Sequence, residues 1–131
     1  MIFLDTDIIS YYFDGEHKIK ARLDEVFRLK EDICTTVVNV YEVIKGLRWR
    51  DNKQKEAKIK HFLKDIKVFA VQKNVVDEAA SIYADLRKKG ITIGDADVLI
   101  AAVVITNNGT LVTNNTKHFE CIKQLKVVKW G

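Results

Sequence analysis

The sequence of 131 residues contains no proline, only two cysteines and no long hydrophobic run. Because proline, Gly/Ser-rich linkers, repeats and low-complexity stretches are absent, nothing marks a domain boundary, and we expect one domain over residues 1–131. No apolar stretch approaches the roughly 20 residues that a membrane span needs. Asp5 interrupts the apolar start of the chain too early for a signal-peptide core. We therefore expect a cytoplasmic protein without a membrane partner.

Cysteine and histidine are also too sparse to indicate a zinc site. Cys34 and Cys121 lack the spacing of metal ligands, and we expect two buried, reduced thiols. His17, His61 and His118 are isolated from one another in the sequence. Any metal site must therefore be built from oxygen ligands, which favour a hard cation.

The net charge of +4 is unevenly distributed. The segment Lys45–Lys73 holds ten Lys and Arg residues against only Asp51, Glu56 and Asp65, which leaves −3 for the remainder. A solvated helix face explains such a run by itself. A phosphate-binding surface becomes the better explanation only if an acidic catalytic site lies nearby.

Short apolar runs rich in β-branched residues alternate with helical patterns. The runs predict strands at Ile2–Leu4, Ile33–Thr36, Val68–Val71, Thr110–Thr113 and Lys126–Val128. Helical spacing of apolar residues appears over 19–27, 59–66 and 76–83, and Gly90 is expected to stop the last helix. The segment Val98–Ile105 is apolar nearly all round, which predicts a buried helix that ends at Asn107–Gly109.

This alternation predicts an α/β fold with a central, mostly parallel sheet flanked by helices on both faces. In such folds ligands bind at the carboxyl ends of the strands. Asp5 follows the first predicted strand directly, and Thr6 or Asp7 is expected to open the next helix. Simple turn and N-cap roles account well for Asp7 and less well for Asp5.

Two further acidic residues lie near predicted helix starts. Glu42 follows Asn39 by three residues, a spacing typical of a capping box, yet the same position places its carboxylate near Asp5. Both roles are compatible. Asp95 is a natural N-cap for the buried helix, whereas Asp97 lies inside the first turn, where a second acid is typical of a metal ligand.

The strand at 111–113 runs into Asn114, Asn115 and Thr116, which offer polar ligands at another strand end, although turn chemistry explains asparagine equally well. If these segments share one edge of the sheet, Asp5, Glu42 and Asp97 converge and repel one another. Mg²⁺ or Mn²⁺ would offset that repulsion and activate water against a phosphodiester. The basic segment would then hold a nucleic-acid backbone.

The chain resembles the PIN domain, and specifically the VapC toxins of toxin-antitoxin pairs. The resemblance spans the whole chain and rests on four motifs in order: Phe3-Leu4-Asp5-Thr6-Asp7, Tyr41-Glu42-Val43-Ile44-Lys45-Gly46, Ile93-Gly94-Asp95-Ala96-Asp97-Val98-Leu99-Ile100-Ala101-Ala102, and Leu111-Val112-Thr113-Asn114-Asn115 followed by His118-Phe119. It implies a PIN-like fold and a metal-dependent endoribonuclease that leaves a 3′-hydroxyl and a 5′-phosphate.

The resemblance assigns roles residue by residue. Asp5, Glu42 and Asp97 form the acidic core that binds the metal, with Asp5 and Asp97 as principal ligands and Asn115 at a fourth position that is Asp or Asn in the family. Thr6 and Thr113 would orient carboxylates or water. It further implies a homodimer and a VapB-type antitoxin whose tail enters the acidic groove.

Two departures from the family pattern concern charge. Asp7 stands where the family often has Asn, and Asp95 is an additional acid that we interpret as a helix cap. Asn115 in place of Asp lowers the negative charge of the site by one, which disfavours binding of a second metal.

Two other functions are compatible with some of these residues. The pair of segments Asp5–Asp7 and Gly94–Asp97 also resembles haloacid-dehalogenase-type phosphatases, with Asp5 as nucleophile and Asp7 as acid/base. Ile9 then occupies a position that is usually Thr or Val, and Glu42 has no role. The second alternative is a PIN fold that binds nucleic acid without catalysis, against which the intact acidic residues argue.

Overall fold

The computed structural model describes residues 1–131 and contains five strands and seven helices. In chain order these are β1 (Ile2–Leu4), α1 (Thr6–Phe13), α2 (His17–Arg28), β2 (Ile33–Thr36), α3 (Val37–Trp49), α4 (Lys53–Leu63), β3 (Lys67–Phe69), α5 (Lys73–Lys88), α6 (Asp95–Thr106), β4 (Thr110–Val112), α7 (Thr116–Phe119) and β5 (Lys126–Val128). No helix is long and apolar enough to cross a membrane.

The sheet has the strand order β3-β2-β1-β4-β5, and every neighbouring pair is parallel. The chain builds outward from β1 through β2 to β3, then crosses to the other side of β1 to add β4 and β5. The predicted α/β fold with a central parallel sheet is therefore confirmed. The reversal beside β1 makes the carboxyl ends of β1 and its neighbours the expected place for a ligand.

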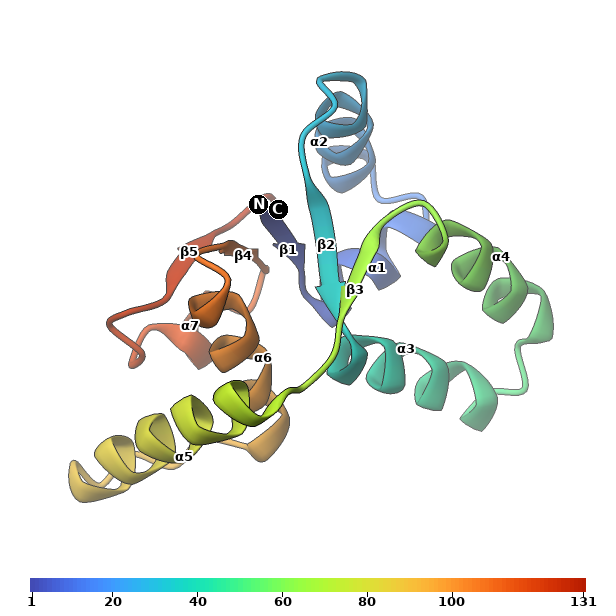
Figure 1. Ribbon diagram of the computed structural model, residues 1–131. Coiled ribbons are helices and arrows are strands. Elements are labelled where there is room, and N and C mark those ends of the chain that lie inside the picture. The colour runs from blue at the N-terminus through green and yellow to red at the C-terminus, as the bar shows by residue number, and fades with distance from the viewer.

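Successive side chains of β1 point into two separate hydrophobic cores. Phe3 lies in a core with residues of α5, α6 and α7, whereas Leu4 lies in a second core with residues of α1, α2, α3 and α4. Both side chains are fully buried. Because successive side chains of a strand point to opposite faces, a three-residue strand is enough to join the two layers. Figure 1 shows α5, α6 and α7 on one side of the sheet and α3 and α4 on the other.

Helix α6 is buried along most of its length, as its apolar sequence predicts. Val98 and the run Ile100–Val104 are all buried, and the helix ends at Asn107, followed by Asn108 with φ 54°. Helix α5 ends before Gly90, whose φ of 75° suits a residue without a side chain. Both predicted helix ends are confirmed.

Two strands are shorter than the sequence pattern predicts. Strand β3 covers Lys67–Phe69 and does not reach Val71, because Phe69 pairs with Thr36, the last residue of β2. Strand β4 ends at Val112, which pairs with Leu4, the last residue of β1. The other three predicted strands have the observed bounds. The thiol prediction is correct for Cys34, which is buried, whereas Cys121 is only half-buried.

Candidate active site

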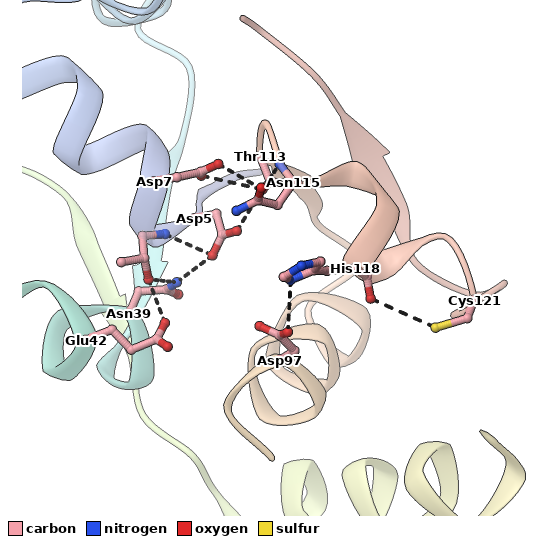
Figure 2. A network of polar contacts seen from close by, with 10 residues as sticks. Asp5, Asp7, Asn39, Glu42, Asp97, Thr113, Asn115, His118 and Cys121 are labelled. Carbon is pink, nitrogen blue, oxygen red and sulfur yellow. Dashed lines mark hydrogen bonds and ion pairs between the residues drawn. The ribbon is translucent and has the colours of Figure 1, made fainter. Parts of the chain in front are cut away.

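Polar side chains gather where β1, β2 and β4 end. Asp5 follows β1, Thr36 ends β2 and begins α3, and Thr113 follows β4. Figure 2 shows the acidic residues from α1, α3 and α6 around this edge of the sheet, with Asn115 and His118 beside them. The strand ends and helix starts that carry these residues therefore share one edge of the sheet.

Asp5 is the most enclosed of these carboxylates, with 6% of its surface exposed. Its Oδ1 accepts hydrogen bonds from Thr6 N at 2.9 Å and from Asn39 Nδ2 at 3.0 Å, and its Oδ2 accepts one from Thr113 Oγ1 at 2.7 Å. Asp5 is also the N-cap of α1. The sequence-based preference for Asp7 as the cap was therefore wrong, because the strand delivers Asp5 to the cap position.

Burial raises the pKa of Asp5 from 3.8 to about 6. The hydrogen bond from Thr113 lowers this pKa, while the negative charges of Asp7 and Asp97 raise it further. None of the Lys and Arg ion pairs in the structure involves Asp5. The site therefore keeps a buried carboxylate whose charge is balanced by hydrogen bonds alone.

Asp7, in α1, is linked by hydrogen bonds to the residues that follow β4. Its Oδ2 accepts a hydrogen bond from Asn114 N at 3.0 Å, and both of its oxygens lie 3.4 Å from Thr113 Oγ1. Burial raises the pKa of Asp7. This carboxylate is committed to holding the loop that carries Thr113 and Asn115, a role that the sequence did not indicate.

Glu42 lies in the second turn of α3 and does not belong to a capping box. The helix begins at Val37, and its N-cap is Thr36, whose hydroxyl accepts a hydrogen bond from Asn39 N at 3.1 Å. The capping-box prediction was wrong because β2 runs directly into the helix. Glu42 Oε1 instead accepts a hydrogen bond from Thr6 Oγ1 at 2.7 Å, which joins α3 to α1.

Asn39 is a site residue that sequence reasoning assigned only to capping. It is fully buried, and its amide nitrogen donates to both Asp5 Oδ1 and Thr6 Oγ1 at 3.0 Å. A signal was available, because Asn39 shares the buried face of α3 with Val43 and Leu47 at a spacing of four residues. A polar residue in an apolar helix face requires a partner.

Asp97 lies in the first turn of α6. The N-cap of this helix is Gly94, and Asp95 is its exposed first residue, so the prediction that Asp95 is the cap was wrong. Asp97 Oδ2 lies 3.5 Å from His118 Nδ1. Burial raises the pKa of Asp97, His118 lowers it, and the charge of Glu42 raises it again.

These electrostatic effects connect the three predicted acidic residues. The negative charge of Asp97 raises the pKa of Asp5, and that of Glu42 raises the pKa of Asp97. The three carboxylates are therefore linked by electrostatic repulsion. His118 was treated in the sequence as an isolated histidine, and only the turn into α7 brings it to Asp97. No three His, Cys, Asp or Glu side chains stand close enough together in the structure to hold an ion.

A PIN-domain family model matches residues 2–123 of this sequence. The chain belongs to the PIN-domain family. One curated relative is ribonuclease VapC1 of Methanocaldococcus jannaschii, which is 31% identical over 124 residues, covering 94% of this chain and 82% of the relative. Another is the tRNA(fMet)-specific endonuclease VapC of Shigella flexneri, 27% identical over 130 residues, covering 98% and 96% of the two chains.

Solved structures show the same fold. In the crystal structure of VapBC2 from Rickettsia felis bound to a DNA fragment from their promoter, one chain matches all of this PIN domain with a TM-score of 0.90 and 28% identity, over its own full length. The chain in VapBC-1 from nontypeable Haemophilus influenzae matches 99% of this PIN domain and 98% of its own length, with a TM-score of 0.84 and 28% identity. The VapC-like character predicted from the four motifs is confirmed.

These findings contradict the phosphatase alternative. It made Asp7 a free acid/base, yet in this PIN domain Asp7 accepts the backbone hydrogen bond of Asn114. It also gave Glu42 no role, whereas Glu42 is held in place by Thr6. The family match covers residues that include all four motifs.

The donor set of this PIN domain fits a hard divalent cation. The four carboxylates of Asp5, Asp7, Glu42 and Asp97 are paired with no Lys or Arg, and the imidazole of His118, beside Asp97, is the only basic side chain among their contacts. Carboxylate oxygens are the preferred ligands of Mg²⁺ and Mn²⁺. Asn115 adds an amide, and its backbone N donates to Thr113 Oγ1 at 3.0 Å, which places it beside Asp5.

Proposed function

We propose that this PIN domain is a metal-dependent endoribonuclease, a VapC-like toxin that hydrolyses RNA phosphodiester bonds. The observation that carries the proposal is Asp5, a buried carboxylate without a basic partner, in the field of Asp97. Asp5, Glu42 and Asp97 are its proposed metal ligands, and Asn115 is the fourth catalytic position. The curated relatives named ribonuclease VapC support this reading.

Mg²⁺ or Mn²⁺, when bound, would activate water and offset charge on the phosphodiester. The protein's own part is to hold the oxygen donors in place. Thr113 and Asn39 hold the two oxygens of Asp5, and Thr6 holds Glu42. Such hydrogen bonds restrict the rotation of the acidic side chains. Thr6 and Thr113 thus have the contacts that the resemblance implied for them.

The basic segment Lys45–Lys73 supplies the positive charge that an acidic pocket needs to attract RNA. Three of its ten cations are paired with carboxylates, namely Arg48 and Lys60 with Glu56 and Lys55 with Asp14. The others remain available to phosphates. Because the acidic site lies at the start of α3 and this segment begins in α3, RNA held by the segment can extend to the site.

A VapB-type antitoxin and a second copy of the chain are the proposed protein partners. The two neighbours of known structure described above are VapBC complexes. An apolar hollow of about 520 Å³ between the end of α1 and α4, walled by Tyr12, Phe13 and Phe62, offers an apolar contact surface for a partner. RNA as substrate implies that the protein acts in the cytoplasm.

The test is cleavage of structured and unstructured RNA by the purified protein with Mg²⁺, Mn²⁺ or EDTA. Asp97→Asn should lose about 100-fold or more of the activity, because charge at the metal site is lost. Asp95→Asn is the matched control, since it removes the same charge two residues away from an exposed position. Cleavage products with 5′-phosphate ends are expected. RNA that stays intact with every metal would favour the binding-module alternative or a target RNA outside the set tested.

A further inference from the structure

A cavity of about 340 Å³ opens beside Asp97, between the loop that precedes α6 and the start of α7. Its walls include Ile91, Thr92, Ile93, Asp97, Lys117 and His118. Asp97 is the only proposed metal ligand that borders this cavity. Whatever occupies the cavity therefore lies next to the proposed reaction centre.

The cavity has one apolar side and one basic side. Ile91 and Ile93 form an apolar side, and both pack against the core of α5 and α6. Lys117 and His118 form a basic side at the start of α7, and the imidazole of His118 is 63% exposed. A ligand that matches both sides needs a flat or apolar part and an anionic part.

Several polar groups around the cavity have no partner within the protein. Lys117 makes no ion pair, although His118 beside it contacts Asp97. The backbone N–H groups of Thr92 and Gly94 make none of the backbone hydrogen bonds found in the turns and loops. Free donors around an apolar wall are typical of a binding pocket that fixes the orientation of its ligand.

We propose that this cavity binds one nucleotide of the RNA substrate, next to the phosphodiester that is cleaved. Lys117 would contact a phosphate, while the base would lie between Ile91 and His118 and meet the donors of Thr92 and Gly94. Unstacked RNA bases pack on flat side chains such as histidine and are read at their edges. The cavity volume is near the lower end of the roughly 300–1,000 Å³ of ligand pockets, which suits one nucleotide. This inference rests on the proposed function.

The phosphate contact is tested by RNA affinity at several salt concentrations. The measurement uses a fluorescein-labelled, unstructured 20-mer RNA and the Asp5→Asn protein with Mg²⁺, so that the RNA remains intact. Lys117→Ala should reduce the slope of log affinity against log salt by about 0.7, the value for one phosphate contact on a single strand. Lys18→Ala in α2 is the matched control, since Lys18 is exposed and outside the cavity. Equal slopes for the two variants would contradict the proposal.

The base contact is tested by nuclear magnetic resonance with the four ribonucleoside 5′-monophosphates and with inorganic phosphate. The nucleotides should shift the amide signals of Thr92, Gly94 and Lys117 more than inorganic phosphate does, and Ile91→Ala, which removes one wall against which the base would pack, should reduce the shifts that the nucleotides cause. Shifts of equal size with inorganic phosphate would reduce the cavity to an anion site and overturn the proposal. So would an absence of shifts.

The two proposals fail in different ways. If RNA is cleaved normally by Lys117→Ala and Ile91→Ala with unchanged KM, the nucleotide site is wrong and the nuclease stands. If RNA is never cleaved but the nucleotides shift these amide signals, the nuclease is wrong and the binding site stands.

Discussion

Thr113 donates a hydrogen bond of 2.7 Å to Asp5 Oδ2, although 108 positions separate the two residues. Both follow central strands, and Leu4 and Val112 are paired directly before them. The parallel register therefore brings the hydroxyl to the carboxylate. This contact is the most direct link between the sheet and the chemistry of the site.

Thr113→Val should move the pH dependence of RNA cleavage. The hydrogen bond lowers the pKa of Asp5, so its removal raises that pKa, and a larger share of Asp5 is protonated at a given pH. A hydrogen bond to a charged group contributes about 1.5–3 kcal/mol, which corresponds to roughly 1–2 pH units. The acid limb of the rate profile should shift upward by that amount. Thr113→Ser keeps the hydroxyl and should retain the wild-type profile; identical shifts for both variants would show that the hydroxyl is not responsible.

Asp5→Asn should stabilise the metal-free protein at pH 7.5 relative to wild type while it abolishes cleavage. The folded pKa of Asp5 is about 6 against 3.8 in the unfolded chain, so the folded state binds the proton more tightly. Stability therefore falls as pH rises from about 4 to about 6 and stays reduced above that range. The full difference is about 3 kcal/mol. Asparagine has no such charge to bury.

The measurement is urea unfolding in EDTA at pH 4 and pH 7.5. The advantage of Asp5→Asn over wild type should be largest at pH 7.5 and shrink toward pH 4. Added Mg²⁺ should stabilise wild type more than the variant, because a ligand that binds only the folded state stabilises it. An advantage that is the same at both pH values would mean that burial of Asp5 has no electrostatic cost.

Glu42→Gln should separate the charge of this residue from its structural contact. The amide oxygen of glutamine can still accept the hydrogen bond from Thr6, so the melting temperature should stay near the wild-type value. Cleavage should fall about 100-fold or more, because the negative charge is gone. Glu42→Ala should lose both activity and stability. Near-normal cleavage by Glu42→Gln would reduce Glu42 to a structural role.

Much of the fold could be predicted because periodicity and strand ends are local properties. The strand Ile2–Leu4, the buried helix around Val98–Val104 and the stop at Gly90 all follow from patterns within a few residues. The end of β3 could not be predicted, since it depends on where β2 stops pairing with it. Register is set by contacts between segments, which a single sequence does not display.

The candidate site also combines features set by local sequence with features set by contacts between distant segments. Asp5, Glu42 and Asp97 could be named because motifs and strand ends carry them, whereas their partners required the three-dimensional structure. Asn39 reaches Asp5 across 34 positions, and Asp7 turned out to hold Asn114. Capping roles were assigned one residue or more away from the actual caps, because Thr36 and Gly94 take those positions. Helix starts depend on where the preceding chain leaves its strand or loop.

Gly109→Ala should destabilise the fold, because this residue lies against the central strand. A Cβ at position 109 would stand 2.5 Å from Cε2 of Phe3, and this side chain of β1 is fully buried in a core with residues of α6. The ring must shift within a closed core, which typically costs about 1–3 kcal/mol. Gly46→Ala is the control and should increase stability. Position 46 lies inside α3, and the nearest contact of an added Cβ would be Arg50 Nη1 at 3.6 Å. Alanine is the better helix former by about 1 kcal/mol. The free energy of unfolding of both variants is measured with urea. A Gly109→Ala protein as stable as wild type would mean that the Phe3 ring has room to move, and that the core around β1 is looser than its burial indicates.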